Sequence, residues 1–161
     1  DAYRLAKERG VQRFGIHTML ASNELQYSYM VETSQMLLDL IGKLEIELNI
    51  RFEFINIGGG LGIPYRPDEP AFNLERMGEE ITGQFRRFKE KHGSMPALYM
   101  ESGRYMTGPH GVLVVKAINR KSIYRTYIGV DASMSALMRP GMYQAYHHID
   151  VLGKNGASAK E

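Results

Sequence analysis

Two long segments with helical periodicity alternate with three short apolar runs, and this alternation limits the folds that the chain can adopt. The apolar runs cover residues 13–20, 52–57 and 97–101, and the helical segments cover about 28–49 and 73–92. Each helical segment carries one apolar stripe, made of Leu37, Ile41, Leu44 and Leu48 in the first and of Leu74, Met77, Ile81, Phe85 and Phe88 in the second. One stripe indicates one buried face. The apolar runs lack polar alternation, as is typical of parallel strands covered on both sides. The pattern predicts a βαβαβ unit, from either a (β/α)8 barrel or a doubly wound sheet.

The pattern changes after residue 108. Residues 111–122 and 125–133 are rich in β-branched side chains, are bounded by Gly, Asn and Ser, and carry no helical stripe. Such segments predict strands of another kind, and we expect them to be antiparallel. We therefore expect two domains, with residues 1–108 in the α/β part and residues 109–161 in the β part. The tail over residues 153–161 is small and polar, and we expect it to be frayed.

Composition narrows the function classes. The 161 residues are 43% hydrophobic, which suffices for one sizeable core. The net charge of +2 gives no support for nucleic-acid binding. No run of 18 apolar residues exists and the N-terminus lacks a signal-peptide core, so we expect a soluble cytoplasmic protein that does not bind a membrane. The chain has no cysteine, which excludes disulfides and thiolate metal ligands, and we expect no metal site.

Three consecutive glycines follow the second apolar run, in INIGGGLGIPY (55–65). Glycine is costly to order, and it allows backbone amides to turn toward one anion and a ligand to approach the main chain. Gly58, Gly59 and Gly60 stand where a parallel strand leads into a loop and then a helix, the usual ligand edge of α/β folds. The motif matches neither the P-loop nor G-x-G-x-x-G. The alternatives are a phosphate site and a merely tight turn.

The other strand ends also carry polar residues. Glu101 ends the third apolar run, three residues before Arg104, with Gly103 between them. A buried carboxylate needs a partner, and either a protonated heterocyclic nitrogen or a local salt bridge to Arg104 would supply it. The first run offers His17 and Ser22. Convergence of three such strand ends is typical of the mouth of a barrel.

Three motifs, in this order and spacing, carry a family resemblance: INIGGGLGIPY, YMESGRYMTGPHGVLVVKA and YIGVDASMSALMRPGMYQAYHHI. They resemble the diaminopimelate decarboxylase family, which also holds ornithine and arginine decarboxylases. The resemblance runs over nearly the whole chain. It implies part of a (β/α)8 barrel, related to that of alanine racemase, followed by the start of a β-domain, with pyridoxal 5'-phosphate at the C-terminal mouth of the barrel.

The resemblance also implies roles for single residues. Glu101 would pair with the pyridine nitrogen, and Arg104 would lie beside the phosphate and the substrate. Arg139 and Tyr143, in MRPGMY, match a substrate-contacting Arg and Tyr of the family. The residues implied to bind the cofactor are His17, Ser22, Gly58, Gly59, Gly60, Glu101, Gly103 and Arg104.

One departure concerns the cofactor ring. The family commonly stacks a histidine on the ring, and Met19 stands at that position here. His17 lies two residues earlier and points to the same face of the strand. As an alternative to the histidine, we consider that Met19 covers the ring through a contact of its sulfur.

The family's Schiff-base lysine and its catalytic cysteine find no match in this chain, so we expect an internal fragment that is inactive alone. The leading hypothesis is a decarboxylase that converts meso-diaminopimelate to lysine. The alternatives are a decarboxylase of ornithine, lysine or arginine, in the L or the D configuration, and a catalytically silent regulatory relative. The first two differ in what Arg139 recognises, because only diaminopimelate brings a second carboxylate. The family further implies a homodimer in the full-length protein.

Overall fold

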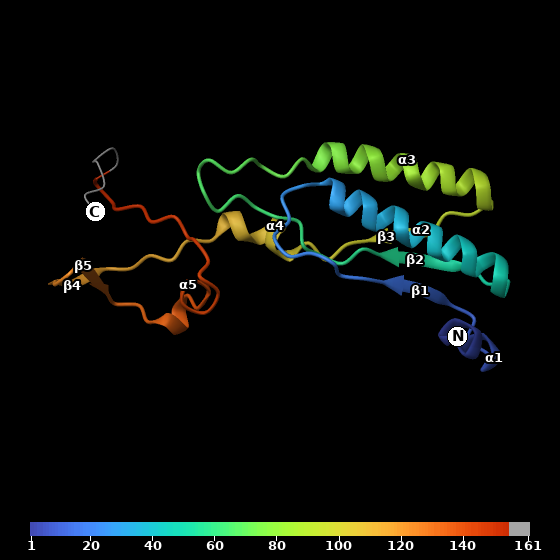
Figure 1. Cartoon of the computed structure of the whole chain (residues 1–161), viewed down its shortest axis with the longest axis horizontal. Coiled ribbons are helices and arrows are strands. Elements are labelled where there is room, and N and C mark those ends of the chain that lie inside the picture. The colour runs from blue at the N-terminus through green and yellow to red at the C-terminus, as the bar shows by residue number, and fades with distance from the viewer. Residues whose placement is uncertain (155–161) are drawn as a thin grey trace. The chain divides into compact units, whose positions relative to one another are not determined.

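The computed structural model describes residues 1–154, which form two compact units (Figure 1). The first contains Asp1–Pro64 and Pro70–Pro109, and the second contains Tyr65–Glu69 and the chain from His110 onward. The fraying expected of the tail concerns mainly residues 155–161, which lie outside the described residues.

The first unit is built on a parallel sheet of three strands in the order β1-β2-β3. The strands are β1 (Phe14–His17), β2 (Phe52–Asn56) and β3 (Ala97–Tyr99). Gly15 pairs with Phe54, and Phe54 pairs with Ala97. The predicted βαβαβ order is confirmed. Three strands form an open sheet, so closure of a barrel stays an expectation.

Two long helices cover one side of this sheet (Figure 1). They are α2 (Ser28–Leu48) and α3 (Leu74–His92), and both match the predicted helical segments. The core between helices and sheet includes Leu38, Ile41, Ile55 and Ile57, each at most 1% exposed. The predicted stripes face this core, except that Leu74, the first residue of α3, is 45% exposed. A short helix, α1 (Ala2–Glu8), precedes the sheet.

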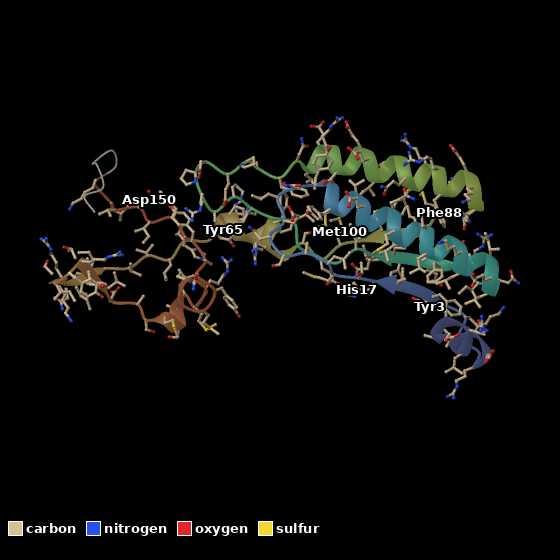
Figure 2. The ribbon with its side chains drawn as sticks, in the orientation of Figure 1. Tyr3, His17, Tyr65, Phe88, Met100 and Asp150 are labelled. Atoms are coloured by element: carbon tan, nitrogen blue, oxygen red, sulfur yellow. The ribbon has the colours of Figure 1, made fainter. Side chains whose placement is uncertain are left out.

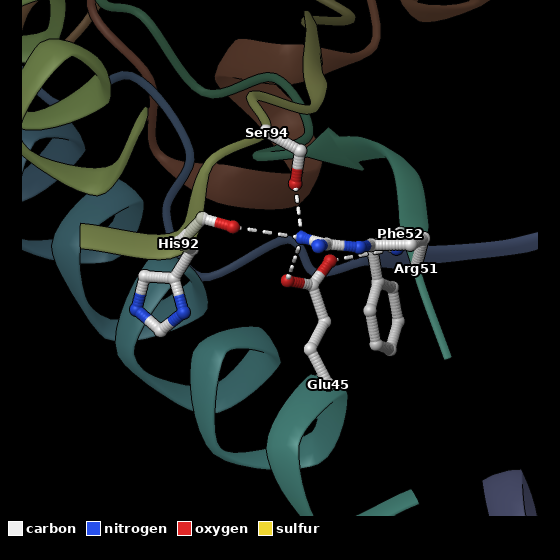
Figure 3. A network of polar contacts seen from close by, with 5 residues as sticks. All are labelled: Glu45, Arg51, Phe52, His92 and Ser94. Atoms are coloured by element: carbon white, nitrogen blue, oxygen red, sulfur yellow. Dashed lines mark hydrogen bonds and ion pairs between the residues drawn. The ribbon is translucent and has the colours of Figure 1, made fainter. Parts of the chain in front are cut away.

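A polar network fixes the end of the sheet where β2 begins (Figure 3). Glu45, on α2, has a buried carboxylate whose Oε1 accepts a hydrogen bond from the Phe52 N–H over 2.9 Å. Arg51 donates to the His92 carbonyl over 2.9 Å and to Ser94 Oγ over 2.6 Å. Its Nη1 also lies 3.5 Å from Glu45 Oε2. The network joins the C-terminal ends of α2 and α3 to the start of β2 and leaves the opposite end of the sheet for a site.

The second unit holds an antiparallel hairpin of β4 (Ala117–Ser122) and β5 (Thr126–Val130). The two predicted strands therefore pair as expected, but the first begins at Ala117 rather than at residue 111. Within the described residues, no strand pairs with residues 111–116. Short helices lie in both units: α4 (Gly103–Thr107) in the first, η2 (Met134–Ala136) and α5 (Arg139–Tyr143) in the second, and η1 (Gly108–His110) where the sequence passes from the first unit to the second.

The strands of the first unit are also shorter than predicted. β1 ends at His17, because after the hydrogen bond from Thr18 N–H to Asn56 O the chain leaves the ladder. β3 ends at Tyr99, and Glu101 N–H pairs instead with Gly58 O. Within residues 1–154, no helix has both the length and the apolar character needed to cross a bilayer.

Candidate functional site

The carboxyl ends of the three parallel strands meet at one edge of the first unit. Glu101 N–H donates to Gly58 O over 2.8 Å, and Ile57 N–H donates to Tyr99 O over 3.1 Å. Hydrogen bonds therefore continue past the formal end of β2 and β3. They bring the glycine loop, defined here as Gly58–Gly60, against the chain that follows β3.

Close backbone packing requires glycine at all three positions of the loop. A Cβ at Gly58 would lie within 3.0 Å of Thr18 O, one at Gly59 within 3.0 Å of Glu101 O, and one at Gly60 within 3.0 Å of Ala21 O. Gly58 and Gly60 also have φ of 71° and 101°, which favour glycine. The loop thus packs between the chain segments that follow β1 and β3. This is a packing reason for the glycines that the sequence alone does not reveal.

Two N–H groups of the glycine loop have side-chain acceptors. Gly58 N–H donates to Asn56 Oδ1 over 2.9 Å, and Gly59 N–H lies 3.4 Å from Met19 Sδ. A thioether sulfur is a weak acceptor. The Gly59 N–H is therefore available to a stronger acceptor such as a phosphate oxygen. Met19, predicted only as a substitute for a stacking histidine, lies at this loop.

Glu101 has two polar neighbours across the sheet edge. Asn56 Nδ2 donates to Glu101 Oε1 over 2.8 Å, and His17 Nε2 lies 3.7 Å from the same oxygen. Figure 2 labels His17, the last residue of β1. The Glu101 side chain is 55% exposed. The expectation of a buried carboxylate is wrong, because β3 ends two residues earlier and lies at the edge of the sheet.

At this sheet edge, Asn56 is a residue that sequence reasoning missed. It is the last residue of β2, directly before the buried Ile57 and the glycine loop. The only signal in the sequence is a polar residue at the end of an apolar strand. With Asn56 and His17 beside it, the Glu101 carboxylate has partners from β2 and β1, which the two alternatives drawn from the sequence did not include.

Ser22, Gly103 and Arg104 lie on the segments that flank the glycine loop. Ser22 is exposed, and two residues later Glu24 N–H donates to Gly60 O over 2.8 Å. Gly103 N–H donates to Glu101 O over 2.9 Å and begins α4, which carries the half-buried Arg104. The structure thus gathers all predicted cofactor residues on the chain around one sheet edge.

Arg139 and Tyr143 belong to the second unit. Both lie on α5, so the helical turn that their spacing predicts is present. The Arg139 guanidinium lies 4.6 Å from the centroid of the Tyr65 ring, and its Nη1 lies 3.1 Å from His147 Nε2. Tyr143 is 71% exposed. Tyr65 and His147, which sequence reasoning did not single out, therefore hold the predicted substrate-binding arginine.

Comparison with known proteins identifies relatives over most of the chain. The model of the pyridoxal binding domain of pyridoxal-dependent decarboxylases matches residues 1–108. Protein TabA of Pseudomonas amygdali pv. tabaci is 48% identical over 92% of this chain and 35% of its own length. The diaminopimelate decarboxylase of Methanothermobacter thermautotrophicus is 36% identical over the same shares of the two chains, 92% and 35%.

Solved structures agree with the sequence matches. A crystal structure of diaminopimelate decarboxylase superposes with a TM-score of 0.81 at 28% identity, over 98% of this chain and 36% of that one. The enzyme from M. jannaschii gives 0.76 at 33% identity, over 82% and 30%. This chain thus spans about a third of the length of these relatives. It belongs to the family of pyridoxal-dependent decarboxylases that includes the diaminopimelate decarboxylases.

Proposed function

We propose that this chain is part of a pyridoxal-phosphate-dependent decarboxylase that converts meso-diaminopimelate to L-lysine and carbon dioxide. The observation that carries the proposal is a half-exposed carboxylate beside a glycine loop at the carboxyl edge of a parallel sheet. Glu101 N–H donates to Gly58 O, so the two parts are direct neighbours. Membership of a family whose model describes a pyridoxal binding domain supports the same cofactor.

The glycine loop fits the phosphate end of the cofactor. A phosphate oxygen is a stronger acceptor than the Met19 thioether that now faces the Gly59 N–H. Ser22, the backbone at Gly103 and the guanidinium of Arg104 lie on the flanking segments, and we assign them to the same phosphate. Because the glycines are fixed by backbone packing, the N–H directions are set before the anion binds.

Glu101 fits the ring end of the cofactor. A carboxylate beside the pyridine nitrogen favours its protonated form, since opposite charges within a few ångströms stabilise one another. When bound, the cofactor supplies the electron sink for the bond broken as carbon dioxide leaves. Glu101 Oε1 is occupied by Asn56 and approached by His17, which leaves Oε2 for the ring. We therefore assign His17 to the ring-nitrogen end and Met19 to the phosphate end.

The substrate is assigned from the relatives and from one arginine. The diaminopimelate decarboxylase reported above shares 36% identity with this chain, and diaminopimelate is the only candidate substrate with a second carboxylate. A planar guanidinium binds carboxylates through paired hydrogen bonds. In the second unit, Tyr65 and His147 hold Arg139 in one orientation, which suits such recognition.

A second candidate is the same chemistry on another basic amino acid. The relative named Protein TabA shares 48% identity with this chain, more than the diaminopimelate decarboxylase reported above, and its name states no substrate. The test is release of carbon dioxide by the full-length protein, with meso-diaminopimelate, ornithine, lysine and arginine compared as substrates in both configurations.

We expect the largest kcat/KM for meso-diaminopimelate. Arg139→Lys should lose that preference, because lysine keeps the charge but lacks the planar guanidinium that makes paired hydrogen bonds. A larger kcat/KM for a substrate with one carboxylate overturns the substrate assignment. Binding of pyridoxal phosphate without carbon dioxide release from any substrate would instead support the silent regulatory relative.

A further inference from the structure

Asn56 joins the two ends of the candidate cofactor site. Its Nδ2 donates to Glu101 Oε1 over 2.8 Å, and its Oδ1 accepts from the Gly58 N–H over 2.9 Å. Its own backbone carbonyl accepts from Thr18 N–H over 3.0 Å, which holds the residue in the ladder with the chain after β1. One half-buried amide therefore contacts both the carboxylate and the glycine loop.

Only a side chain with both a donor and an acceptor satisfies the two contacts. A carboxylate is acceptor-only when ionised, so it cannot donate to Glu101. A leucine of similar size satisfies neither contact. His17 Nε2 also faces Glu101, but at 3.7 Å it is too far for a direct hydrogen bond. Of these two neighbours, Asn56 therefore makes the short hydrogen bond that can orient the Glu101 carboxylate.

We propose that Asn56 is a positioning residue that orients the Glu101 carboxylate toward the cofactor ring and couples it to the glycine loop. The inference rests on the proposed function, because it gives the ring-nitrogen role to Glu101. With Oε1 held by the amide, Oε2 is the oxygen presented to the ring. The same amide keeps Gly58 in place, so the ring end and the phosphate end of the site are held at a fixed separation.

The experiment is a double-variant cycle of Asn56→Asp and Glu101→Gln in the full-length protein, with affinity for pyridoxal phosphate as the readout. In Asn56→Asp the new carboxylate still accepts from Gly58 N–H but repels that of Glu101, so we expect roughly tenfold weaker binding. In the Glu101→Gln background the glutamine amide can donate to the aspartate, and we expect the penalty of Asn56→Asp to disappear.

Two further measurements separate positioning from a general loss of structure. The first is the ¹⁵N NMR shift of the pyridine nitrogen in labelled cofactor, which we expect to move toward the deprotonated form in Asn56→Leu. The second is the control Asn73→Asp. Asn73 Oδ1 also accepts a backbone N–H, from Arg76 over 3.0 Å at the start of α3, and aspartate caps helices equally well. This control adds the same charge, and we expect no change in affinity.

The outcomes are distinct. If wild-type protein does not bind pyridoxal phosphate, the proposed function fails and takes this inference with it. The role of Asn56 alone is overturned in two cases, both with a wild type that binds pyridoxal phosphate. In the first, Asn56→Asp does not weaken the affinity for pyridoxal phosphate. In the second, Asn56→Asp weakens that affinity equally whether residue 101 is Glu or Gln. If Asn56→Asp alone does not fold, the double variant decides, because the inference requires it to bind pyridoxal phosphate as tightly as Glu101→Gln does.

Discussion

At the residue scale, the role assigned to Glu101 can be separated from cofactor binding. Glu101→Gln keeps the shape of the side chain and can still hydrogen-bond, but it removes the charge that holds the ring nitrogen protonated. We expect pyridoxal phosphate to remain bound through the glycine loop, while turnover per bound cofactor falls by roughly 10²-fold or more because the lost interaction acts mainly in the transition state.

Turnover must be divided by bound cofactor rather than by protein chain. If Glu101 only braces Asn56 and the neighbouring loop, the substitution would lower cofactor loading and leave the turnover of each loaded site nearly unchanged. That second result would remove Glu101 from the chemistry and leave it as a part of the fold.

Gly59 gives a second prediction at this scale. Its missing Cβ would come within 3.0 Å of Glu101 O, a backbone atom that cannot turn away. We expect Gly59→Ala to lower the free energy of unfolding by about 1–3 kcal/mol, and to weaken cofactor binding as a consequence. Gly78→Ala is the control, because nothing lies within 4 Å of a Cβ there. Because Gly78 lies in helix α3, Gly78→Ala should raise the free energy of unfolding by up to about 1 kcal/mol. Unchanged thermal stability in Gly59→Ala would contradict the packing account.

The positions of these residues can be predicted from the sequence better than their contacts can. Glu101 and the glycine loop are predictable, because both follow apolar strands at the ligand edge of an α/β fold. The contact of Met19 with Gly59 and the two bonds of Asn56 are not, since they depend on which residues of neighbouring strands lie opposite one another. These parallel strands are joined by long helices rather than by tight turns, so their register is fixed only when their buried faces pack together and cannot be read from one strand alone.

At the element scale, Glu45 fixes α2 to the start of β2. Its Oε1 is the acceptor for the N–H of Phe52, a residue that is 4% exposed. Glu45→Ala leaves that buried donor without a partner, and we expect a loss of about 1–3 kcal/mol in the free energy of unfolding. Glu45→Gln keeps an acceptor oxygen and should lose less. Chemical denaturation of both variants measures the difference.

The control for this prediction is Glu53→Ala. Glu53 is the residue that follows Phe52 in β2. Glu53 makes a double hydrogen bond with Arg13, at 2.8 and 2.9 Å, but both side chains are exposed. Solvent screens such a pair, so its loss should destabilise the fold less than Glu45→Ala does. An equal or larger effect of Glu53→Ala would contradict the importance given to the buried carboxylate.

Tyr3 is one of the residues that attach helix α1 to the first unit, beside Lys7, whose Nζ donates to Leu48 O. Tyr3 OH donates to Gly15 O over 2.9 Å, and its ring packs edge-on against Phe52. Burial raises the pKa of the Tyr3 phenol, because the charged form loses hydration. The stability that Tyr3 contributes to the fold is therefore fully present below the ordinary tyrosine pKa and is lost as pH rises through the raised pKa. We expect Tyr3→Phe to cost about 1 kcal/mol at neutral pH, and to flatten the alkaline fall in stability. Identical alkaline slopes in the two proteins would contradict this.

The elements themselves follow the sequence closely. Both long helices are predictable, because a single apolar stripe specifies one buried face. The ends of β1 and β3 are not, since each strand stops where its neighbour turns into the glycine loop. Residues 111–116 look like a strand by composition, yet a strand needs a neighbour. In residues 1–154 no strand pairs with them, and Lys116 bonds only to Asp131, one residue beyond β5.

At the scale of the whole molecule, the first unit has an open sheet. Within the described residues, β1 and β3 each pair on one side only. Phe54 and Tyr99 stack edge-on, 5.3 Å apart, and are 36% and 55% exposed. Unpaired strand edges readily associate with further strands, and exposed aromatic side chains on an uncovered sheet face favour contact with other chain segments. The first unit by itself therefore leaves surface that a longer chain or a second subunit would cover.

The last prediction concerns assembly. The family resemblance implies active sites that lie between two subunits, each completing the other, and we expect the full-length protein to be a homodimer with a twofold interface. Activity should then depend on protein concentration, because dissociation would separate the two halves of every site. Sedimentation velocity over a dilution series, with specific activity assayed at each concentration, tests this directly. The fall in activity should follow the fall in dimer fraction. A monomer that keeps full specific activity at the lowest concentration would overturn the shared site.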